Sequence, residues 1–95
     1  MNIGKALEII RKEKKVRQVD VAAAVGITQT SYSQIENSRK RPLYATLEAI
    51  AKALDVCIVD IYLLALEPED FPASRREKYD LMYPAVKALI KIIIR

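Results

Sequence analysis

The 95-residue chain lacks histidine and tryptophan and has one cysteine and two glycines. Without histidine, and with Cys57 as its sole cysteine, the chain cannot build a zinc site alone or close an internal disulfide. Cys57 is expected to be a small, half-buried residue. The chain also has no phosphate-cradling glycine loop, no evident pair of catalytic acids and no activated nucleophile. These absences predict a protein that is not an enzyme and that needs no metal or cofactor.

Long apolar runs are absent too. None approaches the roughly 18 residues that a membrane-spanning helix needs, and Lys5 and Glu8 interrupt the apolar N-terminus, which argues against a secretory leader. Hydrophobic residues make up 52% of the chain, with four prolines, so a disordered or fibrous chain is not expected. We expect a cytoplasmic protein with one domain, or one small domain and an extension.

The positive charge is concentrated in the first half of the chain. Residues 1–41 carry nine basic and four acidic residues, a net charge of +5, whereas residues 42–66 carry one and three, a net −2. Residues 67–95 carry six basic and five acidic residues, a net +1, which completes the total of +4. This asymmetry is typical of a protein with one side that faces a polyanion. Within it, the run Lys12–Lys15 is interpreted as a solvated helix end, with a second phosphate-facing edge as the alternative.

Apolar residues recur at helical spacing in five segments, which predicts an all-α fold. The expected helices cover residues 2–14, 18–25, 28–37, about 47–54 and about 58–65. Gly26 suits the left-handed position after the second helix, and Thr28 can cap the third. About three residues separate these two helices, which is helix-turn-helix spacing.

The third expected helix has two distinct faces on a wheel of about 100° per residue. Tyr32 and Ile35 lie on its core-facing arc. The opposite arc carries only uncharged hydrogen-bonding side chains, namely Gln29, Thr30, Ser33, Gln34 and Asn37. An ordinary solvated face would mix Lys, Glu and Arg, whereas amides can pair with adenine in the major groove and discriminate against a wrong base by roughly 1–3 kcal/mol. We therefore favour a base-reading face over a plain soluble one.

The register of residues 18–56, QVDVAAAVGITQTSYSQIENSRKRPLYATLEAIAKALDV, resembles the phage repressor and Cro-type (XRE-like) helix-turn-helix family. With the flanking helices the resemblance covers about residues 3–66. It implies a five-helix, lambda-repressor-like DNA-binding domain in residues 1–66. It also implies a close approach of the second and third helices at Ala22 and Gly26.

The resemblance implies roles for individual residues. Base contacts are expected from Gln29, Thr30, Ser33 and Gln34. Phosphate contacts are expected from Gln18, Arg17, Thr28, Asn37, Arg39, Lys40 and Arg41. A structural salt bridge is expected between Arg11 and Glu36. Two positions depart from the family pattern, since Arg17 replaces a capping Ser or Thr and Ser38 replaces a frequent Gly.

The remaining residues divide into a linker at 67–74 and a helix at 75–95, in which Pro84 suits an N1 position. From Pro84 onward the apolar residues cover much more of the wheel than the stripe of about 100° needed to pack on one domain. We interpret this segment as a dimerisation element. The expected dimer interface consists of Met82, Val86, Leu89, Ile90 and Ile93. A helix buried within one monomer, an Ile-rich strand and a membrane-surface helix are the alternatives.

Together these features predict a sequence-specific DNA-binding transcriptional regulator, most simply a repressor. It would bind double-stranded DNA as a homodimer and insert the helix at 28–37 in the major groove of a near-palindromic operator. The alternative is the antitoxin of a toxin–antitoxin pair, which covers a toxin with its C-terminal segment and autoregulates its operon. A controller of a restriction-modification system is a further regulatory alternative.

Overall fold

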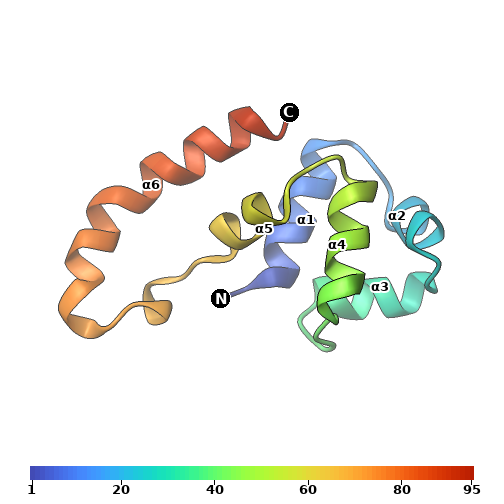
Figure 1. The fold of residues 1–95 in the computed structure, drawn as a ribbon, viewed down its shortest axis with the longest axis horizontal. Helices are drawn as coiled ribbons and strands as arrows, with labels where there is room; N and C mark the ends of the chain where they lie inside the picture. The colour runs from blue at the N-terminus through green and yellow to red at the C-terminus, as the bar shows by residue number, and fades with distance from the viewer.

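The computed structural model describes residues 1–95 and is all-helical, as predicted (Figure 1). Its α-helices are α1 (Ile3–Glu13), α2 (Gln18–Val25), α3 (Gln29–Glu36), α4 (Tyr44–Ala53), α5 (Ile58–Ala65) and α6 (Arg76–Ile93). Two short 3₁₀ helices, η1 (Pro68–Asp70) and η2 (Ala73–Arg75), connect α5 to α6. Figure 1 shows α2 and α3 at one end of the molecule and α6 at the other. None of the helices is both long and apolar enough to span a membrane.

Local side-chain and backbone chemistry fixes the ends of the first three helices. The Asn2 side chain accepts a hydrogen bond from the Lys5 amide at 2.9 Å, and the Thr28 hydroxyl accepts one from the Ser31 amide at 3.0 Å. Each satisfies one of the amides that a helix N-terminus leaves without a partner. Gly26 ends α2 with φ = 83°, a left-handed conformation that glycine adopts without steric cost.

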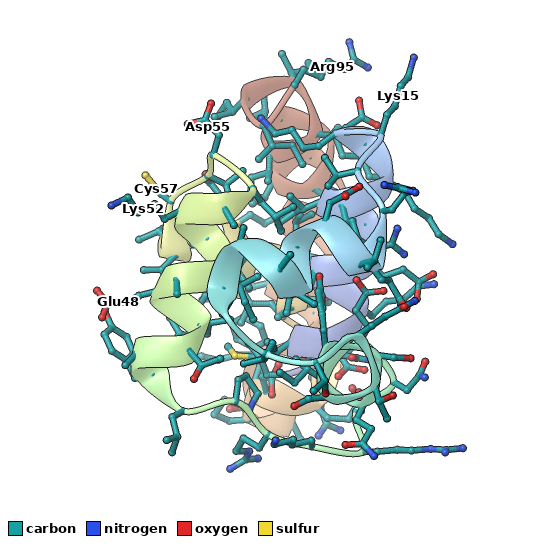
Figure 2. All side chains as sticks on the ribbon, turned by 90° about the vertical axis from the view of Figure 1, so that its right-hand side faces the viewer. Lys15, Glu48, Lys52, Asp55, Cys57 and Arg95 are labelled. Carbon is teal, nitrogen blue, oxygen red and sulfur yellow. The ribbon has the colours of Figure 1, made fainter.

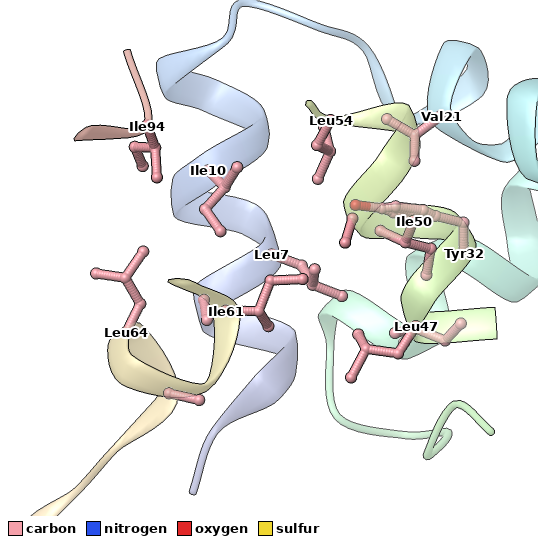
Figure 3. Close-up of a cluster of buried hydrophobic side chains, with 14 of the residues drawn as sticks. Leu7, Ile10, Val21, Tyr32, Leu47, Ile50, Leu54, Ile61, Leu64 and Ile94 are labelled. Atoms are coloured by element: carbon pink, nitrogen blue, oxygen red, sulfur yellow. The ribbon is translucent and has the colours of Figure 1, made fainter. Parts of the chain in front are cut away.

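The core is one cluster of side chains from all six α-helices and from the end of the chain (Figure 3). Leu7 and Ile10 of α1 lie at its centre, fully buried among side chains that include Ile50 of α4 and Ile61 of α5. Tyr32 of α3 is also fully buried, in agreement with its place on the expected core-facing arc. Because α1 contacts both α3 and α5, it holds the helix-turn-helix pair against the rest of the domain.

Gly4 allows an unusually close approach between α1 and the end of α3. A Cβ atom at this position would lie 2.4 Å from the carbonyl oxygens of both Ile35 and Glu36. That separation is well below van der Waals contact, so any side chain here would push the two helices apart. The last turn of α3 is therefore seated directly on the backbone of α1.

The C-terminal segment differs from the expectation in its details. Pro84 lies inside α6 and not at its first turn, because the helix already begins at Arg76. Proline removes the hydrogen bond to the Asp80 carbonyl, but Asp80 and Pro84 are both exposed, so water can replace it. The linker expected at 67–74 contains η1 and most of η2, which ends at Arg75. The Ile-rich ending is helical, which rules out the strand alternative.

One face of α6 packs on its own domain. Tyr79, Tyr83 and Ile90 are buried, and the hydroxyl groups of Tyr79 and Tyr83 donate to the carbonyl oxygens of Leu66 and Leu63 respectively. Ile90 joins the core, and Val86 packs half-buried against it. Of the expected interface residues, Ile90 therefore lies in the core of its own domain and Val86 is partly covered by it, because the sequence could not show which side of the helix meets the domain.

Candidate DNA-binding surface

The polar face of α3 forms a shallow hollow together with the first residue of α2. The hollow has a volume of about 310 Å³ and no apolar lining. Its lining residues are Gln18, Gln29, Thr30, Ser33, Gln34, Asn37 and Arg39. The structure thus brings together all four expected base-contact residues and three of the seven expected phosphate-contact residues. A concave surface that is rich in amides, with Arg39 as its one charged residue, offers both hydrogen-bond donors and acceptors to a ligand.

A buried ion pair fixes the end of α3 beside α1. The Arg11 guanidinium donates from Nε to Glu36 Oε2 at 2.7 Å and from a terminal nitrogen to Oε1 at 3.1 Å. The two side chains are 13% and 2% exposed, and Arg11 also donates to the Val16 carbonyl at 3.0 Å. Burial alone would raise the pKa of Glu36, but its hydrogen bonds to Arg11 and Gln18 outweigh this and lower the pKa. The structural salt bridge expected from the resemblance is therefore present.

Gln18 connects this ion pair to the polar hollow. Its side-chain nitrogen donates to Glu36 Oε1 at 3.0 Å, while the residue also lines the hollow. An amide nitrogen carries two hydrogens, so one remains for a ligand. Glu36 thus positions the first residue of α2 as well as the last turn of α3.

The Arg17 side chain is 78% exposed but is already paired within the chain. Its guanidinium forms two hydrogen bonds to the Asp20 carboxylate, at 2.9 and 3.1 Å, and this pairing lowers the pKa of Asp20. Arg17 occupies the N-cap position of α2 without a side-chain hydrogen bond to the helix, in line with the departure noted in the sequence. An anion that binds Arg17 must therefore compete with Asp20.

The expected phosphate contacts after α3 fall into two groups. Arg39 and Arg41 are exposed and form no ion pair within the chain, whereas the Lys40 ammonium donates to the Ser31 hydroxyl at 2.9 Å. Thr28 and Asn37 lie at the two ends of α3, where Thr28 caps the helix. Ser38 has φ = 60°, a left-handed conformation that favours glycine, in line with the departure at this position noted in the sequence. The two free guanidinium groups are the most available cations of this surface.

Two residues that shape the surface were missed in the sequence. Asp20 follows Arg17 by three residues, a spacing that places oppositely charged side chains together on a helix, so this pair could have been found. Gly4 lies inside a helical pattern, where glycine is unfavourable and can indicate a packing requirement, but its neighbours come from α3 and are known only in the folded chain.

Cys57 differs from its expected environment. It is exposed and not half-buried, and Figure 2 shows its sulfur on the surface near Lys52, at the turn between α4 and α5. Its backbone amide donates to the Asp60 carboxylate at 3.1 Å. No group of three or more Cys, His, Asp or Glu side chains could hold a metal ion.

Comparison with known proteins identifies the class of this surface. A helix-turn-helix family model matches residues 7–60, which span α1 to the start of α5. The chain belongs to the helix-turn-helix family. The chain is 38% identical to the immunity repressor protein of Bacillus phage phi105 over 81 residues, which cover 82% of this chain and 56% of that protein. The resemblance to phage repressors is thereby confirmed.

Two further relatives agree with this assignment. An HTH-type transcriptional regulator of Sinorhizobium fredii, y4dJ, is 34% identical over 62% of this chain and 77% of its own length. The crystal structure of the clp gene regulator ClgR from C. glutamicum superposes with a TM-score of 0.66 and 26% identity, over 67% of this chain and 83% of that one. The chain spans little more than half the length of the phage repressor. The family assignment therefore concerns the helix-turn-helix domain.

Proposed function

We propose that this chain is a sequence-specific transcriptional regulator that inserts α3 into the major groove of double-stranded DNA. The observation that carries the proposal is the amide-rich hollow on α3, in which Arg39 is the one charged residue, together with the exposed guanidinium of Arg41 two residues further on. Base edges are read by neutral donors and acceptors, while phosphates attract cations. The neutral amides of Gln29 and Gln34 are suited to base edges, and the cations that follow α3 are suited to phosphates.

The two groups of side chains have different tasks. Gln29, Thr30, Ser33 and Gln34 contact base edges and provide specificity. Arg39, Lys40 and Arg41 bind phosphates and set the register of the domain on the duplex, together with Arg17, Gln18, Thr28 and Asn37. Gln18 uses its second amide hydrogen for this contact, because Glu36 holds the first.

Repression by occupying an operator is the simplest regulatory mechanism for such a domain. The name of the phi105 relative, an immunity repressor protein, supports this mechanism. A homodimer would present two copies of α3 to a near-palindromic operator, with half-sites one DNA turn of about 34 Å, or a multiple of it, apart. Within α6, Met82, Leu89 and Ile93 are 52%, 60% and 69% exposed and supply the dimer contacts.

A binding-site selection with purified protein, followed by affinity measurements at several salt concentrations, tests the proposal. Gln34→Ala should relax base preference at one position in each half-site, at a cost of about 1–3 kcal/mol against the preferred sequence. Arg41→Ala should weaken binding to all sequences and reduce the salt slope by about one. Glu48→Ala, an exposed residue of α4, serves as the control and should change neither property.

Two results would contradict the proposal. One is a selection that enriches no sequence, and the other is a Gln34→Ala variant with unchanged preference at every position. Co-purification of the chain with a small neighbouring protein bound to α6, in place of a homodimer, would instead favour the antitoxin alternative.

A further inference from the structure

A second apolar stripe runs along α6 beside the face that packs on the domain. On the helical wheel, the buried residues Tyr79, Tyr83, Ile90 and Ile94 share one arc. The neighbouring arc is made of exposed side chains and is free of charge from residue 81 onward. It consists of Leu81, Met82, Ala85, Leu89, Ile92 and Ile93. Leu81 is 81% exposed and Ile92 60%, so the domain itself leaves this stripe uncovered.

The spacing within the stripe is that of a coiled-coil seam. Met82, Ala85, Leu89 and Ile92 follow one another at intervals of three, four and three residues, which is the alternation of a and d positions in a heptad. A helix that packs only on its own domain needs one such stripe, and α6 already uses another for that purpose. The second stripe therefore fits a partner helix with the same spacing.

We propose that this seam packs against the same seam of a second copy, with the two α6 helices antiparallel. The proposal rests on the homodimer of the proposed function and specifies its interface. In this register Met82 packs on Ile92 of the second copy, and Ala85 packs on Leu89 of the second copy. The two-fold axis passes close to residue 87, and the same two layers repeat in reverse order on its other side.

Side-chain size selects the antiparallel arrangement. Antiparallel packing places the small Ala85 opposite the large Leu89 twice, so that the helices stay at an even distance. Parallel packing would place Ala85 against Ala85 and Leu89 against Leu89, which leaves a void in one layer and crowds another. The exposed Ala88, beside the seam and near the axis, has no bulk that would keep the helices apart.

Charge selects the same arrangement. Lys78 occupies the next seam position toward the N-terminus and is exposed. In a parallel pair the two Lys78 ammonium groups would face each other, whereas in the antiparallel pair each lies beyond the end of the partner's seam and stays hydrated. Arg95 follows the end of α6 and pairs with Glu13 of its own chain at 3.2 Å, so Lys78 is the charged side chain that disfavours the parallel pair. The seam is thus complementary to itself when reversed.

Cysteine cross-linking of the full chain tests the register. Cys57 is exposed, so the experiment uses a Cys57→Ser background. Met82→Cys and Ile92→Cys are prepared separately, one of them with a size tag, then mixed, refolded together and oxidised. A disulfide needs Cα atoms about 4.4–6.8 Å apart. In the antiparallel register residue 82 lies opposite residue 92, while the two copies of residue 82 are about 15 Å apart.

The expected result is a mixed disulfide between Met82→Cys and Ile92→Cys, with little product from either variant alone. Efficient cross-linking of each variant with itself, and no mixed product, would overturn the antiparallel register. No cross-link of either kind would overturn the seam.

Size measurements separate this inference from the proposed function. Leu89→Lys should raise the dissociation constant of the dimer by at least about tenfold, while Val59→Lys, at another exposed apolar position, should leave it unchanged. A wild-type dimer that selects an operator but is unaffected by Leu89→Lys would overturn the seam and leave the DNA-binding proposal intact. A wild-type monomer would overturn the seam as well.

Discussion

Replacing Glu36 with alanine should destabilise the domain more than any surface substitution. The variant leaves Arg11, whose side chain is only 13% exposed, with the Val16 carbonyl as the one remaining partner of its guanidinium. Removing one member of a buried ion pair costs about 3–5 kcal/mol, because the other charge stays desolvated. For a domain of this size the melting temperature should fall by at least about 12 °C, since each 1 kcal/mol corresponds to about 4–8 °C.

Urea unfolding followed by circular dichroism measures this loss, with Glu48→Ala as the control. Glu48 is exposed and makes no ion pair, so its variant should stay within about 0.5 kcal/mol of the wild type. A double variant, Arg11→Met with Glu36→Leu, removes both charges and should recover much of the stability. A loss below about 1 kcal/mol for Glu36→Ala would refute the argument that the buried pair holds α1 and α3 together.

The same carboxylate should contribute to acid unfolding. Because the pKa of Glu36 is lower in the folded chain than its ordinary value of 4.5, the unfolded chain takes up a proton first as the pH falls. The stabilisation is fully present above about pH 4.5 and disappears as the pH falls through the lowered pKa. Glu36→Gln should therefore show a shallower loss of stability below pH 4.5 than the wild type. Equal pH slopes for the two proteins would contradict this assignment.

Three further substitutions test other parts of the structure. Gly4→Ala should destabilise the domain by about 1–3 kcal/mol or more in urea unfolding, because its Cβ would overlap the carbonyl oxygens at the end of α3; wild-type stability would contradict the close approach. Asp20→Asn should strengthen DNA binding and steepen its salt slope by up to about one, because it releases Arg17; weaker binding would show that the pair itself is needed. Tyr83→Phe should cost about 1 kcal/mol by removing the hydrogen bond to the Leu63 carbonyl, and unchanged protection of α6 amides from hydrogen exchange would contradict this.

Local patterns predicted the first three helices to within one or two residues at each end. Thr28 and Gly26 have the chemistry of helix ends, and their effect depends on neighbours along the chain. Helical periodicity likewise separated Tyr32 and Ile35, which are buried, from the polar face of α3. The pairing of Arg11 with Glu36, 25 residues apart, was expected only through the family resemblance, because composition and periodicity carry no information about such distant contacts.

The C-terminal segment shows where sequence reasoning fails. An excess of apolar residues predicted more than one contact surface, but the set of interface residues mixed two different faces. Ile90 turned out to be buried against its own core, while Ile92 on the adjacent face is exposed. The orientation of α6 depends on Tyr79 and Tyr83, whose hydroxyl groups bond to carbonyls at the end of α5 and just beyond it.

The sequence by itself determined the helical periods, the helix ends and the chemical character of each face, because these properties depend on residues within a few positions of one another. Only the tertiary structure decided which partner each face meets. It placed Glu36 within hydrogen-bonding distance of Gln18 and packed the end of α3 against Gly4. It also turned one apolar stripe of α6 toward the core and left the other exposed to solvent. Such contacts join residues far apart in the chain, and their geometry follows from packing the whole core.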